Sequence, residues 1–170
     1  MTRLQQGDTS ALAPLYRRHR GVVTAVIRRQ VTGLSASDAE DLSHETFLEL
    51  VKIASRYRPG SSLKGWLCGI ALKKAWRRSR GEWVRSQLLG RFTKSDETSE
   101  DVSNRVDAAR VVNRRLAQLP PAMREVVVLC LVEGVETSDA AVALGISVNT
   151  VWTRLHRARE KLRELEEAES

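Results

Sequence analysis

The sequence is poor in the residues that metal sites and disulfide frameworks need, with 2 cysteines and 3 histidines among 170 residues. Cys68 and Cys130 lie far apart and have no C-x-x-C neighbour. Both are therefore interpreted as small apolar residues of a chain in a reducing compartment. His44 and Glu45 begin like the zinc-protease pattern H-E-x-x-H, but Leu48 stands where the second histidine would be. The sequence thus predicts no metal site.

Long apolar runs and catalytic signatures are also absent. No run approaches the roughly 18 apolar residues of a membrane-spanning helix, and the N-terminus lacks the apolar stretch of a secretory signal. The glycine patterns of phosphate-binding loops, dinucleotide-binding folds and hydrolase nucleophile elbows do not occur. We therefore expect a cytoplasmic protein that is not an enzyme, with no cofactor, no catalytic residue and no membrane insertion.

Charge is distributed unevenly along a chain whose formal net charge is +7. Residues 1–91 hold 17 Lys and Arg against 7 Asp and Glu, whereas residues 92–170 hold 11 against 14. Between the two halves, residues 92–104 are polar and acidic, as in a linker. The alternative is an exposed loop of one domain, but loops longer than about 12 residues are uncommon in compact folds. The sequence thus predicts two small domains, 1–91 and 105–170, joined by a flexible acidic linker.

Apolar residues recur at three- and four-residue steps through the first half, which is the pattern of amphipathic helices. One helix is expected from an Asp8 cap to near Gly33, and a second from a capping box in which Ser37 is the cap. On this second helix the acidic side chains gather on a face of their own, apart from the apolar face. They are Asp38, Asp41, Glu45 and Glu49. The basic half therefore carries an acidic stripe.

A third helix is expected from about Leu63, capped by one of the two serines before it. It runs into a basic tract, because residues 73–91 hold seven Lys and Arg, with Trp76 and Trp83 interleaved. Cations neutralise phosphates and aromatic rings stack on unpaired bases, so the tract favours contact with nucleic acid. The alternative is a solvated basic face whose tryptophans belong to the core.

The second half ends in the pattern of a helix-turn-helix. After a helix over residues 106–119, Pro121 suits the first position of another helix, which Gly134 ends. A short helix over residues 138–144, a turn at Gly145 and a long helix capped by Ser147 follow. The apolar stripe of the long helix is expected to face inward and comprises Val148, Val151, Leu155, Ala158, Leu162 and Leu165. The residues expected to face outward are Asn149, Thr150, Trp152, Thr153, Arg154, His156 and Arg157.

Taken in order, these motifs resemble the extracytoplasmic-function sigma factors, bacterial proteins of the sigma-70 superfamily that direct RNA polymerase to promoters. The segments that carry the resemblance are residues 38–47, 59–67, 70–71, 119–120, 143–151 and 154–159. The resemblance spans nearly the whole chain. It implies an all-α fold of two small domains, a region-two helical bundle and a region-four helix-turn-helix, on either side of the linker.

The resemblance also implies three sets of contact residues and the partners they serve. Core RNA polymerase would be bound through its β flap and its β′ clamp helices, the latter by Asp38, Asp41, His44 and Glu45. The unpaired non-template strand of the minus-ten element, where a base leaves the stack, would be bound by Arg56, Arg58, Ser61, Ser62, Lys64, Trp66, Lys73 and Arg77. The duplex minus-thirty-five element would be read by Asn149, Thr150, Thr153, Arg154 and Arg157.

The chain departs from the family at several positions. Gly69, Leu72 and Lys73 stand where Arg or Asn is common. Glu136 stands where a capping serine is usual, so Thr137 or Ser138 is expected to cap there. The resemblance further implies that the free chain can close on itself or be held shut by an anti-sigma protein.

Two other classes of function remain open at this point. A conventional helix-turn-helix regulator that binds duplex DNA alone leaves the acidic stripe and the basic tract without a role. A scaffold of helical hairpins accounts for the amphipathic patterns but not for the order of the motifs.

Overall fold

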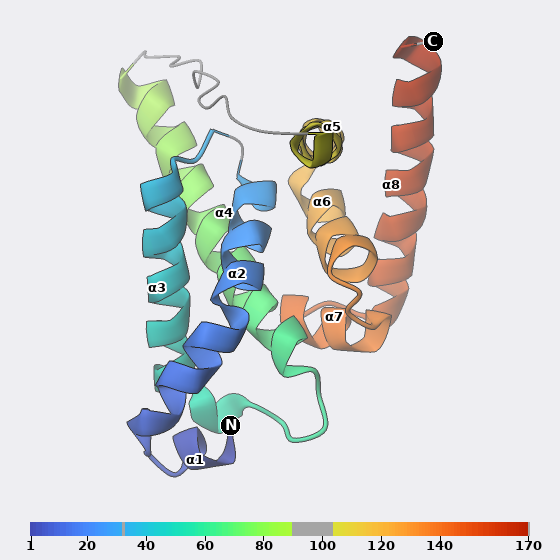
Figure 1. Cartoon of the computed structure of the whole chain (residues 1–170). Coiled ribbons are helices and arrows are strands. Elements are labelled where there is room, and N and C mark those ends of the chain that lie inside the picture. The colour runs from blue at the N-terminus through green and yellow to red at the C-terminus, as the bar shows by residue number, and fades with distance from the viewer. Residues whose placement is uncertain (32, 90–103, 170) are drawn as a thin grey trace.

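The computed structural model describes residues 1–31, 33–89 and 104–169, and the side chains of residues 1–31, 33–80 and 110–168. Every regular element in these ranges is helical, as the all-α prediction requires (Figure 1). The elements are α1 (Thr2–Gln5), η1 (Thr9–Ala11), α2 (Leu12–Gln30), α3 (Ala36–Lys52), η2 (Ala54–Arg56), α4 (Leu63–Leu89), α5 (Asn104–Gln118), α6 (Pro121–Val127), η3 (Val128–Val132), α7 (Thr137–Leu144) and α8 (Val148–Glu169). The predicted linker lies outside the described residues, apart from Asn104, which begins α5.

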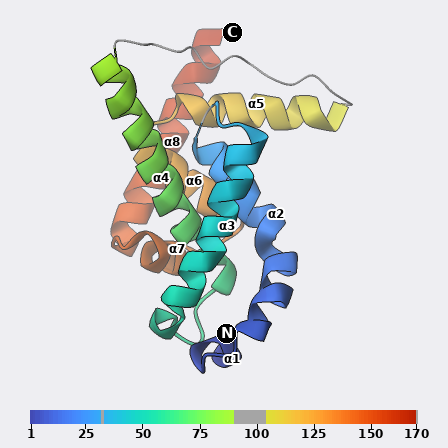
Figure 2. The same cartoon turned by 90° about the vertical axis from the view of Figure 1, so that its left-hand side faces the viewer.

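Helices α2, α3 and α4 pack side by side and bury the apolar faces that the sequence pattern predicts (Figures 1 and 2). Ile27, Leu50 and Leu67, one from each helix, are completely buried at their centre. Burying an aliphatic side chain of this size contributes roughly 1.5–3 kcal/mol, so this core supplies much of the stability of the first half.

The starts of the first three long helices differ in how well local sequence predicts them. The Asp8 carboxylate accepts the Ser10 N–H at 3.0 Å and caps η1, which leads directly into α2. Ser62 Oγ accepts the Gly65 N–H at 3.0 Å and caps α4, as expected. Ser37, however, lies inside α3, and the cap is Ser35, which accepts the Asp38 N–H at 3.0 Å. The capping-box prediction was therefore wrong, because Ser35 also fits a cap and starts the helix earlier.

In the second half, α6 begins at Pro121, as predicted, and continues into the π-helical turn η3. The wider turn is closed by Glu133, whose N–H donates to the carbonyl of Val128 at 2.9 Å. Such turns shift the register of the side chains that follow and are often found at functional sites. Gly134, with φ of +64°, then ends the segment.

Helices α7 and α8 form the predicted helix-turn-helix. Gly145 adopts a left-handed conformation, with φ of +71° and ψ of 37°, which a residue with a Cβ rarely adopts. Ser147 Oγ caps α8 by accepting the Thr150 N–H at 3.1 Å. Two expectations were wrong. Glu136 occupies the cap position of α7 without a side-chain cap bond, and Val148 is 39% exposed because the buried stripe begins only at the next turn.

The core of the second half is completed by residues of the first. Cys68 and Leu72 of α4 belong to the same buried cluster as Val151 and Leu155 of α8, and α4 packs along α7. We call this packing of α2 and α4 against α6, η3 and α7 the interdomain interface. Helix α8 lies on the other side of α6 and α7 from the three-helix bundle (Figure 1).

Gly69 allows the two backbones at the interdomain interface to come unusually close. A Cβ on residue 69 would lie 2.6 Å from the carbonyl oxygen and 2.8 Å from the Cβ of Ala143. Atoms cannot approach so closely without displacement of a backbone. The interface at this point therefore requires a glycine.

In the described ranges, none of the helices combines the length and the apolar character needed to cross a membrane. The same residues contain no group of three or more His, Cys, Asp and Glu side chains that could hold a metal ion.

Candidate functional site

The acidic stripe predicted for the second helix lies on one side of α3. Asp41 and Glu45 are exposed, and Leu48, 59% exposed, follows them on the same side of the helix. Helical spacing of three and four residues brings these three side chains together. Leu48 was missed by the sequence analysis, although its spacing from Glu45 could have placed it on this face. An exposed leucine beside two carboxylates is complementary to a partner surface that presents both apolar and basic groups.

Three carboxylates of the stripe have partners on α4: Glu45 and Glu49 lie 3.6 and 3.9 Å from the ammonium of Lys74, and Asp38 is held more closely. The Ser35 hydroxyl donates to one carboxylate oxygen at 2.6 Å, and the Arg78 guanidinium lies 2.8 Å from the other. The hydrogen bond from Ser35, followed by the charge of Arg78, lowers the pKa of Asp38. Asp38 therefore ties the start of α3 to α4.

The exposed His44 is held against Tyr16 of α2. The two rings are stacked at 5.5 Å between centroids, and the tyrosine hydroxyl lies 2.7 Å from His44 Nε2. This contact orients the imidazole beside Glu45, at the edge of the acidic face.

The loop before α4 is organised around Tyr57. Its ring lies 5.2 Å from that of Trp66, and its hydroxyl donates to the carbonyl of Ser61 at 2.6 Å. Gln5 donates to the carbonyls of Ala54 and Tyr57 from the other side. Three residues of the predicted minus-ten set therefore help to hold this loop and the start of α4 in place. They are Ser61, Ser62 and Trp66. Arg56 and Arg58 of the same set are exposed.

The cations of α4 divide among the surface, the carboxylates of α3 and the interdomain interface. Lys73 and Arg77 are exposed, whereas Lys64 is half-buried and lies 3.3 Å from Glu133 Oε2. Trp76 is 41% exposed, with the Arg80 guanidinium 5.1 Å from its ring centre. Trp76 is therefore not the core residue that the alternative interpretation required. The side chain of Trp83 lies outside the described residues.

The outward face of α8 mostly follows the sequence prediction. Asn149, Thr153 and Arg157 are exposed, and Thr150 is half-buried, with its hydroxyl 2.8 Å from that of Ser147. Trp152, 54% exposed, adds an aromatic ring to this face. A helix that presents amide, hydroxyl and guanidinium groups beside an exposed ring can reach base edges and phosphates in a major groove.

Arg154, which was expected to face outward, is half-buried and lies 3.9 Å from Glu125 of α6. Burial raises the pKa of Glu125, and the positive charges of Arg154 and Lys73 act in the opposite direction. Glu125 and Glu133 were not identified by the sequence analysis. Their pairing depends on contacts between helices, which the local pattern does not contain.

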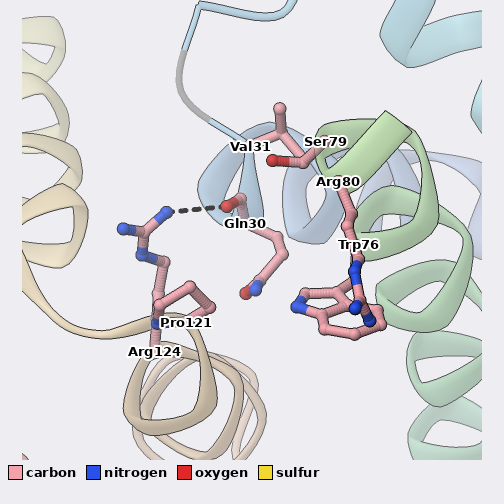
Figure 3. A pocket seen from close by; sticks show the side chains of 7 residues that line it. All are labelled: Gln30, Val31, Trp76, Ser79, Arg80, Pro121 and Arg124. Carbon is pink, nitrogen blue, oxygen red and sulfur yellow. Dashed lines mark hydrogen bonds between the residues drawn. The ribbon is translucent and has the colours of Figure 1, made fainter. Parts of the chain in front are cut away.

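A cavity of about 390 Å³ lies where α2, α4 and α6 meet (Figure 3). Figure 3 shows the guanidinium of Arg124 bonded to the backbone carbonyl of Gln30, with Trp76 on the opposite wall. The Gln30 side-chain oxygen and Arg124 Nε are buried without a hydrogen-bond partner. The cavity is part of the interdomain interface.

Comparisons with known proteins match both halves. Residues 15–85 match the family profile described as Sigma-70 region 2, and residues 109–162 match the one described as Sigma-70, region 4. The chain is 33% identical over 170 residues to the RNA polymerase sigma factor CarQ of Myxococcus xanthus, covering 97% of this chain and 94% of CarQ. It is 33% identical over 135 residues to the ECF RNA polymerase sigma factor SigE of Mycolicibacterium smegmatis, covering 75% of this chain and 51% of SigE. It therefore spans about half the length of SigE.

Solved structures show the same arrangement of helices. CnrH in complex with the cytosolic domain of CnrY has a TM-score of 0.71 and 30% identity, over 99% of this chain and 96% of that one. RpoE in complex with the anti-sigma factor NepR, from Bartonella quintana, has a TM-score of 0.77 at 23% identity, over 95% of this chain and all of that one. At 23% identity, the likeness to RpoE shows a common fold only.

Proposed function

Because the chain belongs to the extracytoplasmic-function sigma factors of RNA polymerase, we propose that its two halves divide polymerase binding and promoter recognition between them. It is an alternative sigma factor, a protein of transcription initiation. The observation that carries the proposal is the presence of two chemically opposite exposed faces on one chain. An acidic face with Asp41, Glu45 and Leu48 lies on α3, and a polar and cationic face lies on α8.

The first half, residues 1–91, is proposed to bind core polymerase and the minus-ten element. Asp41 and Glu45, with His44 and Asp38 beside them, would contact the β′ clamp helices, since carboxylates guide association with a basic partner. Leu48 would add apolar contact area there. The set proposed for the unpaired non-template strand remains Arg56, Arg58, Ser61, Ser62, Lys64, Trp66, Lys73 and Arg77. Trp76, being exposed beside Arg80, is a further candidate for stacking on a base.

The second half, residues 105–170, is proposed to read the duplex minus-thirty-five element and to contact the β flap. Asn149, Thr153 and Arg157 would reach base edges or phosphates directly, with Thr150 supporting the start of the helix. Arg154 would contact the DNA only after its side chain leaves Glu125. Residues 92–104 would then serve as the linker that lets the two halves reach separate elements.

No catalytic step is part of the proposal, and promoter melting would be driven by binding energy alone. The site of action would be the cytoplasm, where polymerase and DNA are found. An anti-sigma protein is a proposed partner, since CnrH, which shares 30% identity, is known in complex with the cytosolic domain of CnrY.

The proposal is tested by run-off transcription on fragmented genomic DNA with purified core polymerase, with and without the chain. We expect new start sites that share two spaced upstream elements and appear only when the chain is present. Absence of new starts with a folded chain, together with tight duplex binding by the chain alone, would identify a conventional helix-turn-helix regulator instead.

A further inference from the structure

An exposed apolar pair interrupts the polar face at the start of α8. Trp152 is 54% exposed and Val148 is 39% exposed. The two residues are four positions apart on a helix that begins at Val148, so their side chains lie on the same side within its first two turns. Clustered apolar side chains at a surface often mark an interaction site, whereas single ones need no explanation. The polar contacts proposed for α8 give this pair no role.

Two hydroxyl groups beside this pair are already engaged within the chain. Thr153 donates its hydroxyl to the backbone carbonyl of Asn149 at 2.9 Å. The Thr150 hydroxyl lies 2.8 Å from that of Ser147. A threonine hydroxyl that donates to the carbonyl four residues earlier has no proton left for a base edge. Base contact on this face therefore falls more on the Asn149 amide and the Trp152 ring.

The position of Trp152 in the helix-turn-helix places its ring where the second helix meets DNA. In this motif the N-terminal residues of that helix reach base edges in the major groove. Trp152 is the fifth residue of α8. Asn149 and Arg157, exposed on the same helix, are residue types that bind base edges and phosphates, which favours DNA over a protein partner as the occupant. The bases of a duplex are stacked, so the apolar groups open to the ring in the major groove are the C5 methyl groups of thymine.

We propose that Trp152 is a specificity-determining residue that reads thymine in the upstream element, by packing its ring against the C5 methyl group. Val148 would extend the apolar contact toward the neighbouring base pair. The inference rests on the proposed function, which supplies the duplex element that α8 enters. An adenine presents an acceptor and a donor that fit the amide of Asn149, so the two side chains together favour A·T pairs.

The test compares the wild type with substitutions at this position and away from it. Trp152→Ala removes the ring at an exposed position where alanine favours the helix, so the fold should be kept. Trp152→Leu keeps an apolar side chain that can still reach a methyl group. Leu131→Ala is the matched control, because Leu131 is also exposed, at 50%, but lies in η3. Circular dichroism checks that each variant keeps the helical content of the wild type.

The first measurement finds the bases that each form requires. Holoenzyme assembled from core polymerase and each form of the chain selects from promoters in which the upstream element is randomised, and the bound DNA is sequenced. We expect the wild type to require thymine at one or more positions, and Trp152→Ala to lose that requirement while it keeps the preferences elsewhere. Trp152→Leu should retain part of the requirement, and Leu131→Ala all of it.

The second measurement isolates the methyl group. Deoxyuridine in place of the selected thymine removes only the methyl and keeps the hydrogen-bonding groups of the base. The wild-type holoenzyme should bind this promoter about fourfold more weakly, the loss expected when one methyl group is no longer buried. Trp152→Ala should bind the two promoters equally.

An equal response of the wild type and Trp152→Ala to deoxyuridine would overturn the proposal, as would a wild-type selection without thymine. Unchanged base preference in Trp152→Ala would overturn it too, and an accompanying loss of core association would assign the ring to a protein contact.

The same selection with the chain alone separates this inference from the proposed function. A thymine requirement that depends on Trp152, in a chain that yields no new transcription starts, would refute the proposed function and keep the recognition of thymine. Enrichment of no sequence, with or without core polymerase, would overturn both.

Discussion

Arg124 of α6 donates a hydrogen bond across the interdomain interface to the backbone carbonyl of Gln30 in α2, at 2.7 Å. The same guanidinium donates to the carbonyls of Ala117 and Leu119, at 2.7 and 3.0 Å. Arg124 is 7% exposed, and burial lowers its pKa. Its side chain thus ties the end of α5 and the start of α6 to the three-helix bundle.

Replacing this guanidinium should destabilise the chain strongly. Arg124→Met keeps much of the side-chain volume but leaves three carbonyls without their donor, so the free energy of unfolding should fall by about 3 kcal/mol. Urea unfolding followed by circular dichroism measures it. Arg159→Met, at an exposed position of α8, should change stability by no more than about 0.5 kcal/mol. Equal effects of the two substitutions would show that the three hydrogen bonds contribute nothing.

The cap of α8 provides a smaller and more local prediction. Ser147→Ala removes the acceptor of the Thr150 N–H and should lower the free energy of unfolding by about 1 kcal/mol. Ser138→Ala is the matched control, because the start of α7 has no side-chain cap bond. Thermal and urea unfolding should find the control close to the wild type. A loss as large at Ser138 would contradict the assignment of the caps.

The buried thiol of Cys68 predicts a loss of stability in alkali. Burial raises its pKa from 9.0 to about 12, so the folded chain holds a proton that the unfolded chain releases. The contribution is complete below pH 9 and is lost as the pH rises from 9 toward 12, by at most about 1.4 kcal/mol per pH unit. Urea unfolding between pH 8 and about pH 10.5 should show a steeper decline for the wild type than for Cys68→Ala. Parallel curves would mean that the thiol is accessible to water.

Polymerase binding should depend on the exposed face of α3. Reversing two charges with Asp41→Arg and Glu45→Arg should weaken association with core polymerase about tenfold at low salt and less at high salt, because salt screens exposed charges. Leu48→Ser should weaken it at all salt concentrations. A competition assay with labelled wild-type chain measures the affinity of each of the three variants for core polymerase. Glu40→Arg, exposed on another side of the same helix, serves as control, and an equal loss there would remove the assignment of a specific face.

Promoter reading should depend on Arg157 and Arg154 in the holoenzyme. Replacing either by alanine should cost about 1–3 kcal/mol per base contact in recognition of the upstream element and leave core binding unchanged. Arg163→Ala, two turns further along the helix and also exposed, should have no effect. Footprinting and core-binding measurements on the same preparations separate the two activities. Parallel loss of core binding would place these arginines outside the DNA interface.

The features that the sequence alone determined are those set by neighbours along the chain. The apolar period placed the helices, Pro121 and Gly145 marked a start and a turn, and Ser147 and Ser62 marked caps, because each depends on bonds within a few residues. The acidic stripe followed from helical spacing for the same reason. The local pattern did not, however, decide which of two suitable serines, Ser35 or Ser37, caps α3.

The tertiary structure alone decided which side chains meet between the two halves. Arg29 and Glu133 are 104 residues apart in sequence, and Lys64 and Glu133 are 69 apart. These pairs form where the two halves pack together, with α4 close to α7 at Gly69, Leu72 completely buried and Arg124 bonded to the Gln30 carbonyl of α2. Periodicity shows that a helix has a face to bury but not which helix buries it, since packing is a property of all the elements together.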